Sequence, residues 1–332
     1  TMATTPDWAK QSAEERAAAV RVMQAYAGMA TAMDREIGRL VAYLKATGDY
    51  DNTIFVFLSD NGAEPTDPYN RLRNRLFLRT QYDTSTANIG RRGSFSAIGP
   101  GWASAASSPL SGYKFSATEG GLRVPLIIAW PGNPRIRAGA INAGLAHVTD
   151  ILPTLLDLAR VPGQDGRWNG RPVERLAGRS LAPMLAGAEG SVHGDRPLGY
   201  ELSGNAALFR GDFKLVRNLP PTGDGRWRLY DLKVDPGETR DLAAAMPDRF
   251  TAMKADYAAF AKTNQVLEMP AGYTADEQIN LYAWRQQGRK RAIQAGLVLG
   301  GAIVALSALL WLFVRRRRAR RVDQANADMI GA

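Results

Sequence analysis

The chain of 332 residues contains no cysteine and only two histidines, His147 and His193. The absence of cysteine excludes disulfides, Cys-ligated zinc, iron–sulfur clusters and thiol nucleophiles within the chain. The stretch that follows Thr1 has no basic segment leading into an apolar one, so no signal peptide is visible. With 45% apolar and 22% charged residues, the composition is that of a globular protein rather than a disordered one.

The formal net charge of +10 is concentrated at one end of the chain. Ten Lys and Arg residues against two Asp residues lie from Arg285 to the end, which gives this part +8 and leaves the rest close to neutral at +2. Proteins that bind nucleic acids carry a basic face on the folded body. We therefore expect no nucleic-acid partner.

Residues 292–314 form an uncharged run of 23 residues. As a helix this run is ~35 Å long, enough to cross ~30 Å of hydrocarbon with some tilt. Four basic residues precede the run and six follow it, which predicts a transmembrane helix with a short cytosolic tail. The main body would then lie in the periplasm or outside the cell. Gly296 and Gly300 have the GxxxG spacing that can pair two such membrane anchors.

Helical and strand patterns alternate along the first half of the chain. Ser12 and Glu15 have the spacing of a capping box, and apolar residues then recur every three or four positions as far as Gly48, which predicts a long helix whose Met and Tyr positions lie in a core. Residues 53–58 and 124–130 are continuous apolar runs, typical of parallel strands buried on both faces. A further helix is predicted near residues 149–160. Together these patterns predict a doubly wound α/β domain.

Two later regions differ from this pattern. Residues 64–113 are polar and rich in Arg, Gly and Ser, and a loop of that length commonly lines or covers a pocket. From residue 199 the pattern changes to short strands, with a hairpin around Gly211, and a helix begins at Pro247. We therefore divide the chain into the main α/β domain, a small α+β subdomain, a linker, a transmembrane helix and a basic tail, at residues 1–198, 199–265, 266–291, 292–314 and 315–332.

Asp60 and Asn61 directly follow the first apolar run. Ligands of open α/β sheets bind at the carboxyl ends of strands, and carboxylate and amide oxygens suit Ca²⁺ or Mg²⁺. Asp-Asn-Gly is also common in simple turns. The local sequence leaves both interpretations open.

Four segments in order resemble the sulfatase family over about residues 15–265. Residues 50–62 resemble the segment that carries the family's Asp-Asn metal ligands, and residues 33–40 resemble the helix before it. Residues 114–125 resemble the second signature, in which a lysine lies five residues before an acidic or amide residue and Gly-Gly. Residues 231–242 resemble the approach to the last helix, and the long loop before Lys114 is similar to that of bacterial arylsulfatases.

The resemblance implies an alkaline-phosphatase-like sandwich and the hydrolysis of sulfate esters of small molecules. In that family a formylglycine, made from Cys or Ser in a C/S-x-P-x-R motif, attacks sulfur over a bound Ca²⁺. By position, Asp60 and Asn61 would be metal ligands for Ca²⁺ in preference to Mg²⁺. Asp60 would also polarise the nucleophile, and Lys114 would contact the sulfate and stabilise the leaving oxygen, where negative charge develops.

The chain also departs from the family pattern. It contains neither Cys nor a Ser-x-Pro-x-Arg motif, and the N-terminal acidic pair that supplies the other metal ligands is absent. His147 and His193 match none of the family's catalytic histidines, so we assign both a structural role. We expect Thr1 to begin within a domain, the formylglycine to belong to a missing N-terminal part, residues 54–58 to lack strand partners, and the chain to be inactive alone.

Two other functions remain open. One is a phosphatase, phosphodiesterase or phosphonate hydrolase of the same superfamily, which uses the same metal cradle. The other is a non-catalytic, membrane-anchored remnant that binds a partner. Intact Asp60, Asn61 and Lys114 argue against a decayed site.

Overall fold

The computed structural model describes residues 5–69, 72–161, 166–168, 170–274, 277–278, 281–282 and 284–330. The chain forms two compact units, Thr1–Glu268 and Met269–Ala332. The longer elements of the first unit are, in chain order, α1 (Ala13–Thr47), β1 (Phe55–Leu58), α2 (Leu72–Gln81), α3 (Gly99–Ser107), α4 (Glu119–Leu122), β2 (Leu126–Ala129), α5 (Ile151–Leu158), α6 (Ala182–Leu185), β5 (Leu198–Leu202), β6 (Asn205–Arg210), β7 (Phe213–Arg217), β8 (Arg228–Asp231) and α7 (Pro247–Thr263).

The ends of α1 confirm the sequence prediction. The backbone N–H of Glu15 donates to the Ser12 hydroxyl at 3.2 Å, and the backbone N–H of Ser12 donates to the Glu15 carboxylate at 2.7 Å. Gly48 ends the helix with a left-handed φ of 81°, which glycine adopts without a steric cost. The capping box and the C-cap therefore lie where the spacing placed them.

The prediction that the apolar positions of α1 lie in a core is wrong. None of its residues is buried, and Met29 and Tyr26 are 66% and 44% exposed. Near its N-terminus α1 does contact α3, since the Trp102 indole N–H donates to the carbonyl of Ala19 at 2.8 Å. A periodic apolar stripe indicates which face of a helix favours burial, but it does not supply a neighbouring element to cover that face.

Strands β1 and β2 pair in antiparallel register, from Phe55 opposite Ala129 to Leu58 opposite Leu126. The prediction that these runs are parallel strands buried on both faces is therefore wrong for this pair, as is the prediction that residues 54–58 lack a partner. Phe57 and Ile127 are 41% and 56% exposed. A continuous apolar run indicates capacity for burial and carries no information about the direction of the neighbouring strand.

Residues 64–113 are not one irregular loop, because α2 and α3 both lie within them. Pro100 is in the first turn of α3, where its fixed φ is compatible with a helix and no backbone N–H is needed. The sequence Gly-Pro-Gly, which reads as a turn, here begins a helix.

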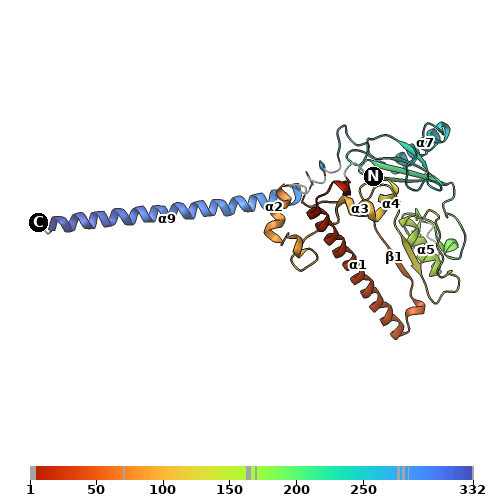
Figure 1. The fold of residues 1–332 in the computed structure, drawn as a ribbon, viewed down its shortest axis with the longest axis horizontal. Coiled ribbons are helices and arrows are strands. Elements are labelled where there is room, and N and C mark those ends of the chain that lie inside the picture. Colours follow the sequence, from red (N-terminus) through yellow and green to blue (C-terminus); the bar gives the residue numbers. More distant parts are fainter. Residues whose placement is uncertain are drawn as a thin grey trace. The chain divides into compact units, whose positions relative to one another are not determined.

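A four-stranded antiparallel sheet, in the order β5-β6-β7-β8, forms the C-terminal part of this unit. The predicted hairpin around Gly211 and the predicted helix from Pro247 are confirmed as the β6–β7 pair and α7. Helix α7 packs against one face of the sheet (Figure 1), where Leu208, Leu215 and Met253 are almost fully buried. Residues of the opposite face pack against the segment that contains Ala117.

The second unit contains a π-helical turn, η5 (Trp284–Gly288), and the helix α9 (Arg289–Ile330). Within α9, Ile293–Phe313 is long and apolar enough to cross a membrane by its length and composition, and the residues of this span whose burial is described are all exposed. A Cβ added at Gly296 or Gly300 would meet no atom within 4 Å. The helix continues through the basic residues 315–321.

Candidate active site

Asp60 and Asn61 lie together at the carboxyl end of β1. The side-chain amide nitrogen of Asn61 donates to Oδ1 of Asp60 at 2.9 Å, and the Ser59 hydroxyl donates to the carbonyl of Asn61 at 2.8 Å. Asp60 is exposed and Asn61 is partly buried. The two side chains thus place hard oxygen donors at the tip of the strand.

Backbone hydrogen bonds join this tip to the segment that carries Lys114. The N–H of Gly62 donates to the carbonyl of Gly121 at 3.0 Å, and the N–H of Lys114 donates to the carbonyl of Ala63 at 3.1 Å. A Cβ at position 62 would lie 1.9 Å from the carbonyl oxygen of Gly120, so only glycine allows this approach. The structure therefore brings the two sequence-predicted segments side by side, although about fifty residues separate them.

The Lys114 ammonium forms an ion pair with Glu64. Its Nζ lies 2.8 Å from Oε2 of Glu64 and 5.4 Å from the centre of the Phe115 ring. Burial raises the pKa of the Glu64 carboxyl, but hydrogen bonds from Lys114 and Thr66 outweigh it and hold that pKa below its ordinary value. Sequence reasoning missed Glu64, because nothing in a polar loop shows which carboxylate will reach the lysine.

A buried ion cluster lies beneath the Lys114 segment. The side chain of Lys214, on β7, is fully buried, with Nζ 2.8 Å from Oε1 of Glu119 and 3.0 Å from Oε1 of Glu238. The other Glu238 oxygen accepts the backbone N–H of Glu119 at 2.7 Å and the Ser111 hydroxyl at 3.0 Å. Sequence reasoning missed this cluster too. Of the three charged residues in the cluster, only Glu119 belongs to a motif identified in the sequence, the second signature.

Two asparagines of the C-terminal part, Asn205 and Asn218, form hydrogen bonds to the backbone of the segment that follows Lys114. Asn205 donates its side-chain amide to the carbonyl of Phe115 at 2.7 Å, and the side-chain oxygen of Asn218 accepts the N–H of Ala117 at 2.6 Å. Phe115 has a φ of 75°, in the left-handed region that a residue with a side chain adopts only when its surroundings hold it there. Hydrogen bonds from Asn205, on β6, and to Asn218, directly after β7, thus hold the backbone at and just after this strained residue.

The donors at the strand tip fit part of a hard-cation site. Ca²⁺ takes six to eight oxygen ligands, and Asp60 and Asn61 would supply about two of them. Among the residues that the structure describes, no group of three or more His, Cys, Asp and Glu side chains could hold a metal ion. The donor chemistry therefore suits a divalent cation, while the set of ligands in the described part of the chain is incomplete.

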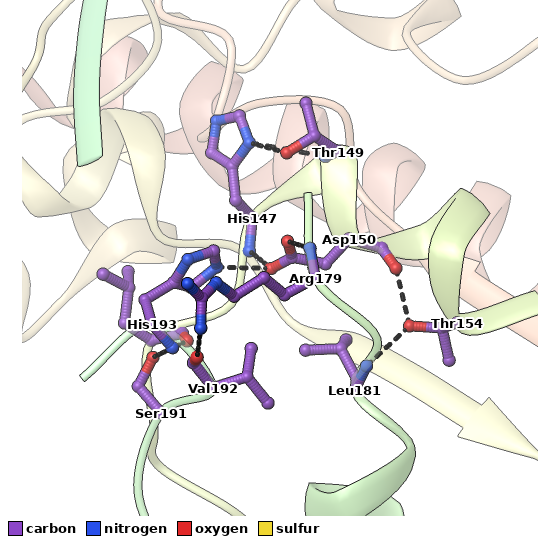
Figure 2. Close-up of polar contacts among 10 residues, drawn as sticks. His147, Thr149, Asp150, Thr154, Arg179, Leu181, Ser191, Val192 and His193 are labelled. Atoms are coloured by element: carbon purple, nitrogen blue, oxygen red, sulfur yellow. Dashed lines mark hydrogen bonds and ion pairs between the residues drawn. The ribbon is translucent and has the colours of Figure 1, made fainter. Parts of the chain in front are cut away.

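The two histidines belong to a hydrogen-bond network centred on Asp150 (Figure 2). The Asp150 carboxylate is fully buried and bonds to the ring Nε2 of His193 at 2.8 Å. It also accepts the backbone N–H groups of His147 at 2.7 Å and Arg179 at 2.8 Å. This arrangement ties the start of α5 to residues 179–193, in agreement with the structural role predicted for both histidines.

A cavity of about 740 Å³ is lined largely by residues 67–105, with further walls from the start of α1. This agrees with the prediction that residues 64–113 line a pocket. Trp8 and Trp102 form one aromatic corner, with ring centres 5.8 Å apart. Arg75, Arg79, Asp67 and Asp83 supply its charges.

Comparisons with known proteins identify the family of the chain. A family model described as sulfatase matches residues 2–161. The chain is 35% identical over 285 residues to an uncharacterized sulfatase of Schizosaccharomyces pombe, covering 84% of this chain and 50% of that protein. It is 36% identical over 180 residues to an arylsulfatase of Klebsiella aerogenes, covering 54% of this chain and 36% of that enzyme.

Among solved structures, the crystal structure of Ps i-CgsB superposes with a TM-score of 0.52 at 25% identity, over 78% of this chain and 46% of that one. The chain thus spans half or less of the length of these relatives. Its α/β fold is sulfatase-like, and the family is generally metal-dependent. The chain belongs to the sulfatase family.

Proposed function

We propose that this chain supplies part of the active site of an arylsulfatase-type enzyme that hydrolyses sulfate esters of small molecules. The observation that carries the proposal is the pair of backbone hydrogen bonds that join Gly62 to Gly121 and Lys114 to Ala63. These bonds join the backbone of the segment that carries Lys114 to the residues that directly follow Asp60 and Asn61. A sulfate ester that reacts there gains negative charge on its leaving oxygen, which a fixed cation stabilises.

In this proposal Asp60 and Asn61 hold a divalent cation, Ca²⁺ in preference to Mg²⁺, and a bound cation would polarise the sulfate oxygens. Lys114 binds the sulfate and stabilises the leaving oxygen, and Asp60 polarises the nucleophile's hydroxyl. Glu64 competes with the sulfate for Lys114, since the same ammonium contacts its carboxylate. No Cys and no Ser-x-Pro-x-Arg motif occurs in the chain, so we expect it to be inactive alone.

Protection of Lys114 from acetylation tests binding without requiring turnover. An aryl sulfate added with Ca²⁺ should slow acetylation of Lys114, measured by mass spectrometry of the full chain in detergent. Lys233, which is 73% exposed, serves as an internal control. A chelator, or the variant Asn61→Ala, should reduce the protection. Equal acetylation with and without aryl sulfate would contradict the proposed site.

The same assay separates the alternatives that share this metal cradle. Stronger protection by an aryl phosphate than by the matching aryl sulfate would favour a phosphatase or phosphonate hydrolase. Protection by neither would favour a non-catalytic membrane-anchored remnant. Hydrolysis of an aryl sulfate by residues 1–284 alone would show that the expected inactivity is wrong.

The proposal extends to the membrane. Residues 292–314 would cross a bilayer once, with the basic tail in the cytosol and the sulfatase segment in the periplasm or outside the cell, as the uneven basic flanks favour. Gly296 and Gly300 would offer a small-residue surface for pairing two anchors. Protease added to intact cells should digest the body and spare the tail. Digestion of the tail with a fully protected body would reverse the orientation.

A further inference from the structure

The cluster of Lys214, Glu119 and Glu238 lies outside the groups that would contact a sulfate ester. Lys214 has a fully buried side chain, and the side chains of Glu119 and Glu238 are 5% and 1% exposed. The contact between Lys214 and Oε1 of Glu238 is an ion pair without the geometry of a hydrogen bond. The contact between Lys214 and Glu119 is both an ion pair and a hydrogen bond. Glu119 is thus the carboxylate that Lys214 holds more specifically.

Glu119 is the first residue of α4, and the next two residues reach the proposed site. Gly120 lies against Gly62 so closely that no side chain would fit between them, and Gly121 accepts the Gly62 backbone N–H. The contacts run from Lys214 through Glu119 to α4 and then to the residue that follows Asn61. Any shift of α4 away from β7 would move the strand tip or break its hydrogen bond.

The burial of Lys214 favours a single position of α4 relative to β7. A buried ammonium loses its hydration and needs carboxylate partners at close range, and removal of one member of such a set leaves a charge uncompensated. Lys214 meets both carboxylates only when α4 and the turn at Glu238 both rest on β7. Glu238 has a φ of 54°, so the turn that presents its carboxylate is itself held in a left-handed conformation.

We propose that Lys214 is a positioning residue: from the C-terminal sheet, it fixes α4 through Glu119 and so sets Lys114 against the Asp60–Asn61 tip. Its consequence for sulfate-ester chemistry rests on the proposed function. The positioning itself does not, because it is measurable without substrate.

The test compares Lys214→Met with Leu215→Ala in the full chain in detergent. Leu215 is the next residue of β7 and packs toward α7 on the opposite face, so its truncation also costs stability but leaves the ion cluster intact. Two quantities are measured below the unfolding temperature of both variants. They are hydrogen exchange in peptides that cover residues 59–63, which include the Gly62 amide, and the acetylation rate of Lys114.

Lys214→Met should raise both rates by about threefold or more, while Leu215→Ala should leave both near those of the unaltered chain. Equal increases in the two variants at matched loss of Tm would reduce Lys214 to a general stability role and overturn the proposal. Unchanged rates in Lys214→Met would overturn it as well.

Glu119→Gln provides a milder second variant if Lys214→Met does not fold. It keeps the shape of the side chain and the ion pair between Lys214 and Glu238, but removes the charge that holds α4. Both rates should rise above those of the unaltered chain, and rates equal to those of the unaltered chain would overturn the proposal. Failure of aryl sulfates to protect Lys114, with these rates still raised, would reject the proposed function alone.

Discussion

The ammonium nitrogen of Lys114 lies 2.8 Å from Oε2 of Glu64, so the lysine expected to face a sulfate ester faces a carboxylate in this structure. Both side chains are partly exposed, at 30% and 42%. An ion pair with that exposure contributes no more than about 1 kcal/mol to folding. Its main effect is therefore on what else the ammonium can bind.

The variant Glu64→Gln should strengthen anion binding at Lys114 with little change in stability. The neutral amide no longer competes for the ammonium, so inorganic sulfate should protect Lys114 from acetylation at lower concentration. Tm should change little. Glu174→Gln, at an exposed carboxylate, is the control and should not change the sulfate concentration needed to protect Lys114 from acetylation. An unchanged concentration in Glu64→Gln would show that Glu64 does not compete.

The variant Gly62→Ala should destabilise the chain and separate the two segments of the site. A Cβ there would lie 1.9 Å from the carbonyl oxygen of Gly120, so one backbone must move, at a cost of about 1–3 kcal/mol. Chemical denaturation measures this cost. Gly38→Ala, within α1 and with nothing within 4 Å of the added Cβ, should instead stabilise by about 0.5–1 kcal/mol. Equal effects of the two changes would contradict the close approach at Gly62.

Local signals in the sequence predicted local structure well. The capping box at Ser12, the left-handed Gly48 and the hairpin at Gly211 each depend on a few neighbouring residues, and each was found where predicted. The order of Asp60–Asn61 and Lys114 also identified the two segments that meet at the site. A family signature preserves which segments meet, even when the residues between them are not interpretable.

Properties that depend on distant partners could not be predicted. The prediction that α1 is buried is wrong, because an apolar stripe does not show whether another element covers it, and Met29 is 66% exposed. The predicted parallel direction of β1 and β2 is wrong, because apolar runs look alike in parallel and antiparallel pairs. The Lys214 cluster joins residues that lie up to 119 positions apart, as between Glu119 and Glu238. Charged residues that pair across such a separation look like surface residues in the sequence.

The variant Asp150→Asn should cost about 1–3 kcal/mol of folding stability. The Asp150 carboxylate is fully buried and receives backbone N–H groups from His147 and Arg179, besides its bond to His193. An amide has one acceptor oxygen, so at least one buried donor would lose its partner. Asp157→Asn, on the helix α5 that Asp150 precedes, is the matched control. Its carboxylate accepts the Ser180 hydroxyl in an exposed position, and we expect a loss below about 0.5 kcal/mol. Equal losses, measured by urea denaturation, would show that the network around Asp150 is not a stabilising centre.

Acidification should weaken this same region through His147. Burial lowers the pKa of His147 from its ordinary 6.5, and nearby His193 lowers it further against the opposing effect of Asp150. The ring nitrogen Nδ1 accepts the Thr149 backbone N–H at 3.3 Å, which the neutral ring can do and the protonated ring cannot. The unfolded chain therefore binds a proton more readily than the folded one, so the contribution of His147 to stability is complete above pH 6.5 and is lost as the pH falls through the folded-state pKa.

Thermal unfolding at about pH 8 and about pH 5.5 measures this loss, since histidine titrates between these values. His147→Gln keeps an acceptor for Thr149 but does not titrate, so its Tm should fall less between the two conditions than that of the unaltered chain. Thr149→Val, which removes the hydroxyl bonded to Nδ1 at 2.8 Å but leaves the backbone N–H and the titrating ring, should retain most of the pH dependence. Glutamine does not titrate, so a pH dependence that persists unchanged in His147→Gln cannot come from position 147. Such a result would assign the acid sensitivity to other groups.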